Sequence, residues 1–214
     1  MVSLVRERQS EKGVKADANS AREVKDETDG ALVGAVARGD AAAFRQLTDK
    51  YLVAVHRLAA RMLGDRNEAE EVAQDTFLKL WTHAGNWRPA SRDSAVLPWL
   101  RSLAMNACID RLRRRRFHSG DEVPERADDR ASPVEQIEQD RIAGLVKHAL
   151  RALPDRQRAA IVLTYYEELP NAEAAAAMDL HLKAFESLLL RARQAMKAAI
   201  AAMGIEACDL KGAA

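Results

Sequence analysis

The sequence predicts an all-α protein of two helical domains, and three features of the chain support this fold class. Hydrophobic residues make up 48% of the 214 residues but aromatic residues only 5%, and Ala and Leu dominate over Val and Ile, which favours helices packed on helices. Apolar residues recur at intervals of three and four. A polar, acidic stretch without this period interrupts the pattern and is typical of a flexible linker. The chain thus divides into a disordered leader (1–28), a first domain (29–118), a linker (119–133), a second domain (134–203) and a tail (204–214).

The start and end signals of helices are clear in the first domain. Two amphipathic helices are predicted on either side of Gly39 and Asp40, where Asp40 can cap the second helix. Gly64 followed by Asp65 predicts another helix end and a new N-cap. The helix that follows is expected to direct one side toward the core, formed by Ala69, Val72, Ala73, Thr76, Phe77, Leu80 and Trp81.

Cationic and aromatic residues gather at the end of the first domain. A loop over 85–94 combines Trp87 with arginines, and a helix over about 97–116 ends in a run of arginines. Guanidinium groups on successive helical positions can neutralise phosphates, although a charge run can equally be a solvated surface. The aromatic loop just upstream favours binding of single-stranded nucleic acid, whose bases stack on rings.

The second domain is predicted to contain four helices, over about 137–150, 154–168, 171–178 and 181–202. The last two, separated by a short turn, have the order of a helix-turn-helix. Small alanines allow a close helix crossing, and the corner between the helices is expected to be filled by Met178, Leu180, Leu182, Phe185 and Leu189. An ordinary helical hairpin is the alternative, because this motif has a high false-positive rate.

Several other classes of protein lack support. The five histidines are scattered without a partner at metal-ligand spacing, so no metal and no cofactor are expected. We find neither a phosphate-binding glycine loop nor a nucleophile motif, and no enzyme is predicted. Cys108 and Cys208 fit a reducing compartment. Without a long apolar run or a signal sequence, a cytoplasmic protein that does not insert into membranes is expected.

Three segments, 67–81, 98–116 and 152–158, resemble the extracytoplasmic-function group of bacterial sigma factors, and the resemblance extends over about 40–197. It implies a sigma region 2 helical bundle followed by a sigma region 4 helix-turn-helix domain. Segment 67–81 is similar to the family's helix that docks on the clamp coiled coil of the polymerase largest subunit. The residues expected to bind polymerase are Glu71, Gln74, Asp75 and Leu78.

Segment 98–116 and the loop before it resemble the family's promoter-melting part, in which a loop receives a flipped base. The residues implied to bind the minus-ten element are Arg88, Ser91, Arg92, Asn106, Asp110, Arg111, Arg113, Arg114 and Arg115. The residues implied to bind the minus-thirty-five element are His181, Lys183, Ala184, Ser187 and Arg191. Glu186 and Leu188 depart from the family's Lys and Arg on this helix, because a carboxylate repels phosphates and Leu188 cannot bond to a base edge.

The resemblance implies a factor that binds core RNA polymerase and promoter DNA, directs transcription initiation and is held by an anti-sigma factor. Two alternatives remain. One is a mimic that titrates an anti-sigma factor without initiating transcription, although the arginine run and the base-capture loop argue against it. The other is a free-standing helix-turn-helix regulator acting as a dimer, which leaves segment 67–81 unexplained and lacks dimerisation heptads.

Overall fold

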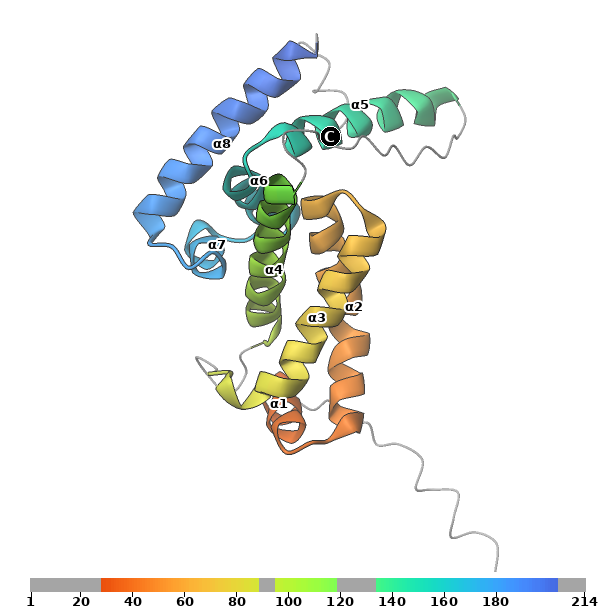
Figure 1. The fold of residues 1–214 in the computed structure, drawn as a ribbon, viewed down its shortest axis with the longest axis vertical. Coiled ribbons are helices and arrows are strands. Elements are labelled where there is room, and N and C mark those ends of the chain that lie inside the picture. Colours follow the sequence, from red (N-terminus) through yellow and green to blue (C-terminus); the bar gives the residue numbers. More distant parts are fainter. Residues whose placement is uncertain (1–27, 89–94, 119–133, 204–214) are drawn as a thin grey trace, which may run out of the picture.

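The computed structural model describes residues 28–88, 95–118 and 134–203, and within these ranges every element is helical (Figure 1). The predicted all-α fold class is therefore confirmed. The predicted leader, linker and tail lie outside the described residues, except for Thr28, whose side chain caps the first helix.

The first domain is built around three long helices. Its elements are α1 (Asp29–Ala37), α2 (Ala41–Leu63), α3 (Arg66–His83), the short 3-10 helix η1 (Ala84–Asn86) and α4 (Leu97–His118). Helices α2, α3 and α4 contact one another along their lengths, while α1 lies across their lower end in Figure 1. The apolar stripes of the long helices meet in this bundle, with Leu47, Leu80 and Leu100 fully buried.

The predicted helix ends in this domain are confirmed. The Asp40 carboxylate accepts hydrogen bonds from the backbone N–H groups of Ala42 (2.8 Å) and Ala43 (3.1 Å), which satisfies two donors at the start of α2. Gly64 ends α2 with φ of 69°, in the left-handed region that glycine adopts without strain. Asp65 then caps α3 by accepting from the N–H of Glu68.

The second domain contains α5 (Val134–Ala152), α6 (Asp155–Ile161), a π-helical turn η2 (Val162–Tyr166), α7 (Asn171–Ala177) and α8 (Leu182–Ala202). A continuous helix over 154–168 was predicted, but after Ile161 the chain widens into the π turn. Helices α7 and α8 form the predicted helix-turn-helix. Ala174, Ala175 and Ala177 are buried between the helices, where their small side chains allow α7 to approach α8 closely.

Two predicted core residues are at the surface instead. Trp81 is 38% exposed: it stands in the last turn of α3 and packs its ring edge-to-face on Phe44, at 5.3 Å between centroids, with the rest of the ring open. Leu182 is 45% exposed because it is the first residue of α8, before the helix reaches its neighbours. The prediction that these side chains fill the core was wrong.

The two domains pack against each other, which the sequence did not predict. Helix α4 contacts α6 and α7, and α2 contacts α5 and the π turn. The buried apolar residues of both domains form one continuous cluster. Figure 1 shows the second domain covering the upper part of the α2–α4 bundle.

Candidate functional site

The outward face of α3 carries the residues expected to bind polymerase. Glu71, Gln74, Asp75 and Leu78 are all exposed, and their spacing places them on the side opposite the buried Ala69, Val72, Ala73 and Leu80. Leu78 is 59% exposed, a large apolar side chain surrounded by polar ones. The face is therefore acidic with an apolar spot, as a docking surface for a basic and partly apolar partner would be.

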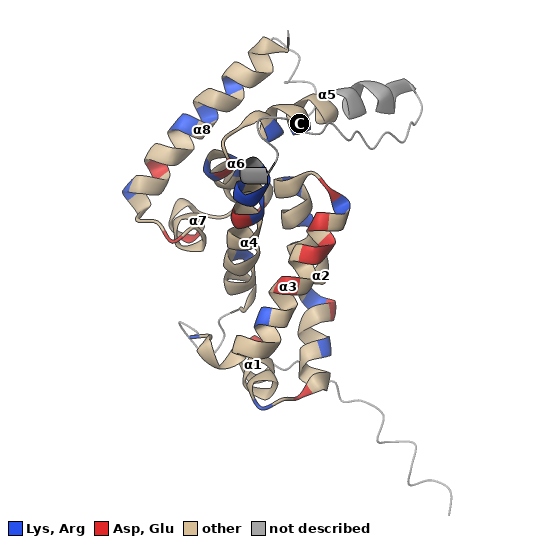
Figure 2. Cartoon of the chain, viewed as in Figure 1, with Lys and Arg blue, Asp and Glu red and all other residues tan. Residues whose placement is uncertain are grey.

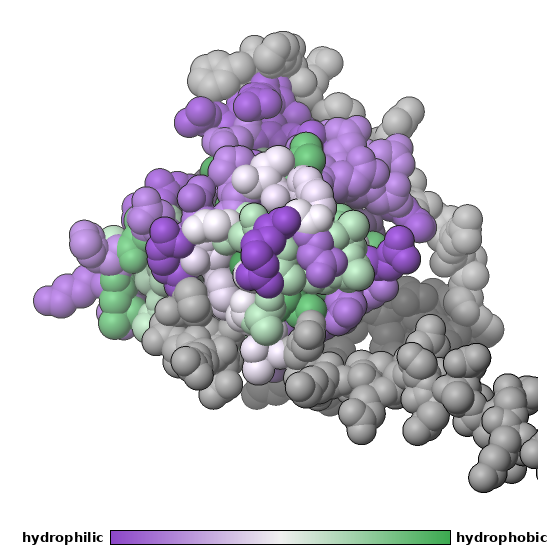
Figure 3. Space-filling view, turned by 90° about the horizontal axis from the view of Figure 1, so that it is seen from below, coloured by the Kyte–Doolittle hydropathy of each residue, from purple (hydrophilic) through white to green (hydrophobic). Residues whose placement is uncertain are grey.

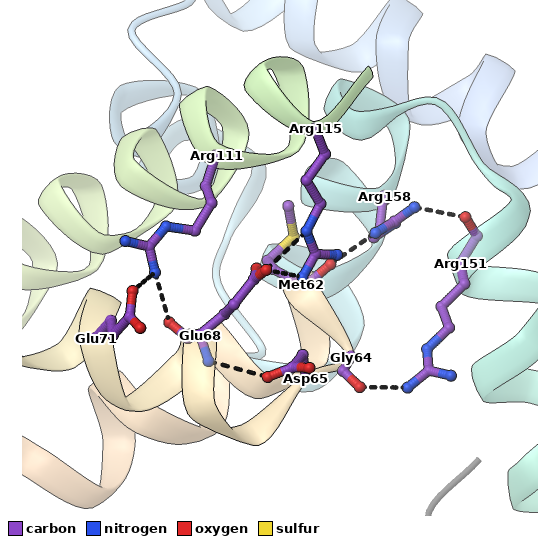
Figure 4. Close-up of polar contacts among 9 residues, drawn as sticks. All are labelled: Met62, Gly64, Asp65, Glu68, Glu71, Arg111, Arg115, Arg151 and Arg158. Carbon is purple, nitrogen blue, oxygen red and sulfur yellow. Dashed lines mark hydrogen bonds and ion pairs between the residues drawn. The ribbon is translucent and has the colours of Figure 1, made fainter. Parts of the chain in front are cut away.

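Arginines of α4 pair with the acidic residues of α3 (Figure 4). Arg111 lies 2.8 Å from a carboxylate oxygen of Glu71 and 4.0 Å from Asp75. Arg115, one turn further on, donates from Nε to Oε1 of Glu68 at 2.8 Å. Figure 2 shows the acidic part of α3 beside the basic end of α4. The residues predicted for polymerase and for the minus-ten element therefore meet at Arg111, which pairs with Glu71 and, at a longer distance, with Asp75.

This pairing divides the arginine run into two faces. Arg111 and Arg115 are half-buried against α3, whereas Arg113 and Arg114 are exposed. Asn106 and Asp110, which belong to the same predicted minus-ten set, are exposed as well. The exposed side of α4 is therefore formed by Asn106, Asp110, Arg113 and Arg114, with Arg111 and Arg115 at its edge.

The loop expected to receive a flipped base is described only at its start. The Arg88 guanidinium donates to the carbonyl oxygens of Gly85 (2.6 Å) and Trp87 (3.1 Å) and is exposed. Ser91 and Arg92 lie outside the described residues.

On α8 the predicted minus-thirty-five residues form one exposed strip. Lys183, Ala184, Ser187 and Arg191 are all exposed, and at about 100° per residue they share one side of the helix. His181 is exposed at the N-cap position of α8, where it makes no capping hydrogen bond. Phosphates are attracted to the start of a helix, so this end of α8 suits a nucleic acid backbone.

The two departures on α8 differ in their consequences. Leu188 is buried, together with Phe185 and Leu189, so it belongs to the core of the second domain and not to the contact strip. Glu186 is exposed and lies beside the strip, next to Lys183 on the helix surface. Leu188 therefore does not alter the exposed strip. Of the two departures from the family pattern, only Glu186 lies beside the residues expected to bind DNA.

A polar cluster around Asp29 was missed in the sequence. The buried Asp29 carboxylate accepts from Tyr51 Oη (2.5 Å), Lys50 Nζ (2.7 Å) and the backbone N–H of Val96 (2.8 Å). Burial alone would raise the pKa of Asp29, but these hydrogen bonds and the Lys50 charge outweigh it, so the pKa is lowered. The cluster ties α1 and α2 to the residue just before α4, and the only signal in the sequence was an acidic residue at a helix start.

The exposed large apolar side chains are spread over several helices and do not form one large patch among the described residues. Seen from the α1 end, weakly apolar residues lie at the centre with hydrophilic side chains around them (Figure 3). Among the described residues, no helix is long and apolar enough to cross a membrane. The same part of the chain holds no group of three His, Cys, Asp or Glu side chains able to bind a metal ion.

Family models match both domains. The model of Sigma-70 region 2 matches residues 47–118, which include α3, α4 and the paired charges between them. The model of Sigma-70, region 4 matches residues 143–196, which include the helix-turn-helix. Both matched models describe segments of sigma-70 proteins, in the same order along the chain.

Relatives that this chain matches over most of their length agree with the two family models. RNA polymerase sigma-H factor of Pseudomonas aeruginosa is 33% identical over 185 residues, covering 81% of this chain and 94% of the relative. ECF RNA polymerase sigma factor SigM of Bacillus subtilis is 32% identical over 157 residues, covering 72% and 92%. The chain therefore belongs to the ECF RNA polymerase sigma factors.

Solved structures have a similar fold. CnrH in complex with the cytosolic domain of CnrY has a TM-score of 0.57 and 26% identity, over 81% of this chain and 97% of CnrH. The sigma factor RpoE of Bartonella quintana, solved with the anti-sigma factor NepR, has a TM-score of 0.58 and 23% identity, over 73% and 96%. The second likeness, at its lower identity, concerns the fold alone.

Proposed function

We propose that this protein directs core RNA polymerase to promoters by using three separate surfaces, and that it catalyses no reaction itself. The α3 face with Glu71, Gln74, Asp75 and Leu78 binds the polymerase. The exposed side of α4 engages the minus-ten element, and the strip on α8 engages the minus-thirty-five element. The observation that carries the proposal is that three exposed helix sides lie within the segments matched by the two family models. They are formed by Glu71, Gln74, Asp75 and Leu78 on α3, by Asn106, Asp110, Arg113 and Arg114 on α4, and by Lys183, Ala184, Ser187 and Arg191 on α8.

The charges of these surfaces suit their proposed partners. Exposed guanidinium groups on α4 and cations on α8 attract phosphates and release counterions on binding. The acidic face of α3 repels the phosphates of DNA, so it favours a protein as its partner. A sigma factor of this kind works in the cytoplasm, where polymerase and promoter are found.

An anti-sigma factor is the proposed regulator. This rests on CnrH, which was solved in complex with the cytosolic domain of CnrY and resembles this chain over most of its length. A protein that covers the α3 face would prevent polymerase from binding to it. Addition of such a protein is therefore expected to abolish transcription by competition.

Run-off transcription tests the function. Core polymerase with this protein should give promoter-dependent transcripts, starting with the promoter upstream of the protein's own gene, and core polymerase alone should not. Binding to polymerase without any transcript would instead favour a mimic that titrates an anti-sigma factor.

A pair of α3 variants tests the polymerase surface. Leu78→Ala removes an exposed apolar side chain and is expected to weaken retention on immobilised core polymerase by about tenfold, the loss typical of a residue central to an interface. Arg66→Ala is the matched control, because Arg66 has an 80% exposed side chain on α3 away from the proposed face. Equal retention of both variants and of the unchanged protein would remove the assignment of this face.

A further inference from the structure

Glu167 joins the two domains through two arginines of the first domain. It follows the π turn of the second domain, and its side chain is only 7% exposed. One carboxylate oxygen accepts from Arg101 of α4, at 3.0 Å from Nε and 2.9 Å from Nη2. The other accepts from Arg61 of α2 at 3.2 Å. A carboxylate held between two guanidinium groups makes charge-assisted hydrogen bonds, the strongest class in proteins.

The second domain also caps the end of α2. Arg158 donates to the carbonyl oxygen of Met62 at 2.7 Å, and Arg151 donates to that of Gly64 at 2.5 Å (Figure 4). Carbonyl groups in the last turn of a helix lack partners within the helix and attract cations. These contacts place two arginines of the second domain on the negative end of a first-domain helix.

A third contact joins α4 directly to the helix-turn-helix. The Ser102 hydroxyl donates to the carbonyl oxygen of Ala177, the last residue of α7, at 3.0 Å. Along α4, Arg114 is about 18 Å from Ser102 at about 1.5 Å per residue. Arg191 is at most about 30 Å from Ala177, counting about 3.8 Å for each residue of the turn and the helical rise beyond it.

The distance between promoter elements is larger than this closed arrangement can span. Positions minus ten and minus thirty-five are about 25 base pairs apart, or about 85 Å at about 3.4 Å per pair. The exposed side of α4 and the strip on α8 are at most about 70 Å apart, which is the sum of the distances along both elements, the separation of Ser102 from Ala177 and the lengths of two arginine side chains. Both surfaces are exposed, but the closed molecule can engage only one element at a time.

We propose that Glu167, held by Arg61 and Arg101, is an autoinhibitory latch that keeps the two domains closed, and that it must release before both promoter elements are bound together. The inference rests on the proposed function, because it presupposes a chain that uses both elements. When the domains separate, water hydrates the carboxylate of Glu167 and both guanidinium groups again. This hydration offsets the loss of attraction between the separated charges. Polymerase and promoter then need only a modest differential affinity to shift the population to the open state.

Distance measurements on the free protein test the latch directly. Spin labels on cysteines at Gln46→Cys of α2 and Gln194→Cys of α8, both exposed positions, report the separation of the domains. Cys208 is replaced by Ser, and the buried Cys108 is left in place. Glu167→Gln leaves Arg61 and Arg101 facing each other without a counter-charge, so a longer and broader distance distribution is expected than in the unchanged protein.

Glu168→Gln is the matched control, since it makes the same change of charge at the neighbouring, exposed residue. It should keep the short, narrow distribution. Arg101→Gln, made from the other side of the latch, should lengthen the distance as Glu167→Gln does, and it covers the case in which Glu167→Gln fails to fold. Distributions that are the same in the unchanged protein, Glu167→Gln and Arg101→Gln would overturn the proposal.

Transcription provides a second readout. At limiting protein, Glu167→Gln is expected to give roughly fivefold more transcript than the unchanged protein from a promoter with both elements, the low end of typical coupling between sites. Its binding to a single-stranded minus-ten oligonucleotide alone should be unchanged, because that surface is exposed in the closed form. Lower transcription by Glu167→Gln together with unchanged distances would contradict the latch. If no variant gives transcripts but Glu167→Gln still lengthens the distance, the latch is supported and the proposed function fails.

Discussion

The buried carboxylate of Asp29 shows how much one residue can hold in this fold. Two donors from α2 and the backbone N–H of Val96, just before α4, converge on its two oxygens. Its lowered pKa means that the folded protein stabilises the charged form more than the unfolded chain does. The stabilisation is fully present above the ordinary Asp pKa of about 4 and is lost as pH falls through the lower pKa of the folded state.

Asp29→Asn is therefore expected to lower the free energy of unfolding by about 2 kcal/mol at neutral pH. Asparagine offers one acceptor oxygen, and its amide group would face a donor. Tyr51 and Val96 account for most of the loss, because the Lys50 side chain is 54% exposed and its ion pair is screened by water. Urea unfolding as a function of pH measures the effect, and the difference from the unchanged protein should shrink under acid conditions.

Asp49→Asn is the control for this prediction. Asp49 is an exposed residue of α2, next to Lys50 in the sequence, and its loss is expected to change stability by less than about 0.5 kcal/mol. A difference between Asp29→Asn and the unchanged protein that stays constant from neutral to acid pH would show that the Asp29 charge is not what stabilises the fold.

Cys108 gives a second prediction at this scale. Burial in the bundle raises the pKa of its thiol to about 12, although the nearby charge of Arg111 opposes this and Glu68 adds to it. Since the thiolate is the reactive form, Cys108 should resist iodoacetamide in the folded protein and react readily in denaturant. Mass spectrometry of the peptide containing Cys108 measures this, and rapid native modification would contradict it.

At the scale of the element, α4 separates its arginines by function. Arg113→Ala is expected to weaken binding to promoter DNA and to reduce the slope of log affinity against log salt by about one, because one phosphate contact is lost. Filter binding over a range of salt concentrations measures the slope. Arg66→Ala on α3 should leave it unchanged, and a slope equal to that of the unchanged protein would remove Arg113 from the DNA surface.

The turns before and after α2 each contain a glycine, and the two can be compared. Gly39 and Gly64 both have positive φ, at 87° and 69°, so alanine is expected to cost about 1 kcal/mol at either position. A Cβ at Gly39 meets open space, whereas a Cβ at Gly64 would overlap the Arg151 guanidinium. Thermal unfolding should therefore show a larger loss for Gly64→Ala than for Gly39→Ala. Equal losses would mean that Arg151 contributes little at this end of α2.

Elements with local signals could be predicted from the sequence, and contacts between distant residues could not. Asp40 and Asp65 cap helices through N–H groups two or three residues away, so their roles follow from the sequence nearby. Trp81 was expected in the core because helical periodicity places it on the apolar side of α3. Periodicity does not show whether another element covers the residue at that point. Glu167 and Arg101 are 66 residues apart, and neither periodicity nor composition indicates that they meet.

In the candidate sites, too, features set by nearby residues could be predicted and contacts between distant residues could not. The exposed strip on α8 and the outward face of α3 follow from helical spacing together with the family resemblance, and the structure leaves these side chains exposed. The sequence did not indicate that Arg111 binds Glu71, since a residue's partner depends on how α3 and α4 cross. The resemblance also placed Leu188 at a DNA-facing position where the family commonly has a cation, although the crossing of α8 with its neighbours buries this residue.

At the scale of the whole molecule, the continuous core predicts one cooperative transition. All three tryptophans belong to the first domain, so their fluorescence reports that domain, while far-UV circular dichroism reports the helices of both. Urea curves from the two probes should coincide for the unchanged protein. A helical signal that persists after the fluorescence change is complete would show that the second domain unfolds separately.

The π turn at 162–166 determines the direction in which the residues that follow it, beginning with Glu167, point. A π-helical turn holds one more residue than an α-helical turn, so deleting a single residue from it would restore ordinary helical phase. Each residue removed rotates the following chain by about 100°. Glu167 would then face another direction while α7 and α8 still formed their motif. An insertion or deletion in these five residues would thus change the stability of the closed state without changing the helix-turn-helix. Evolution can alter the first property in this way and keep the second.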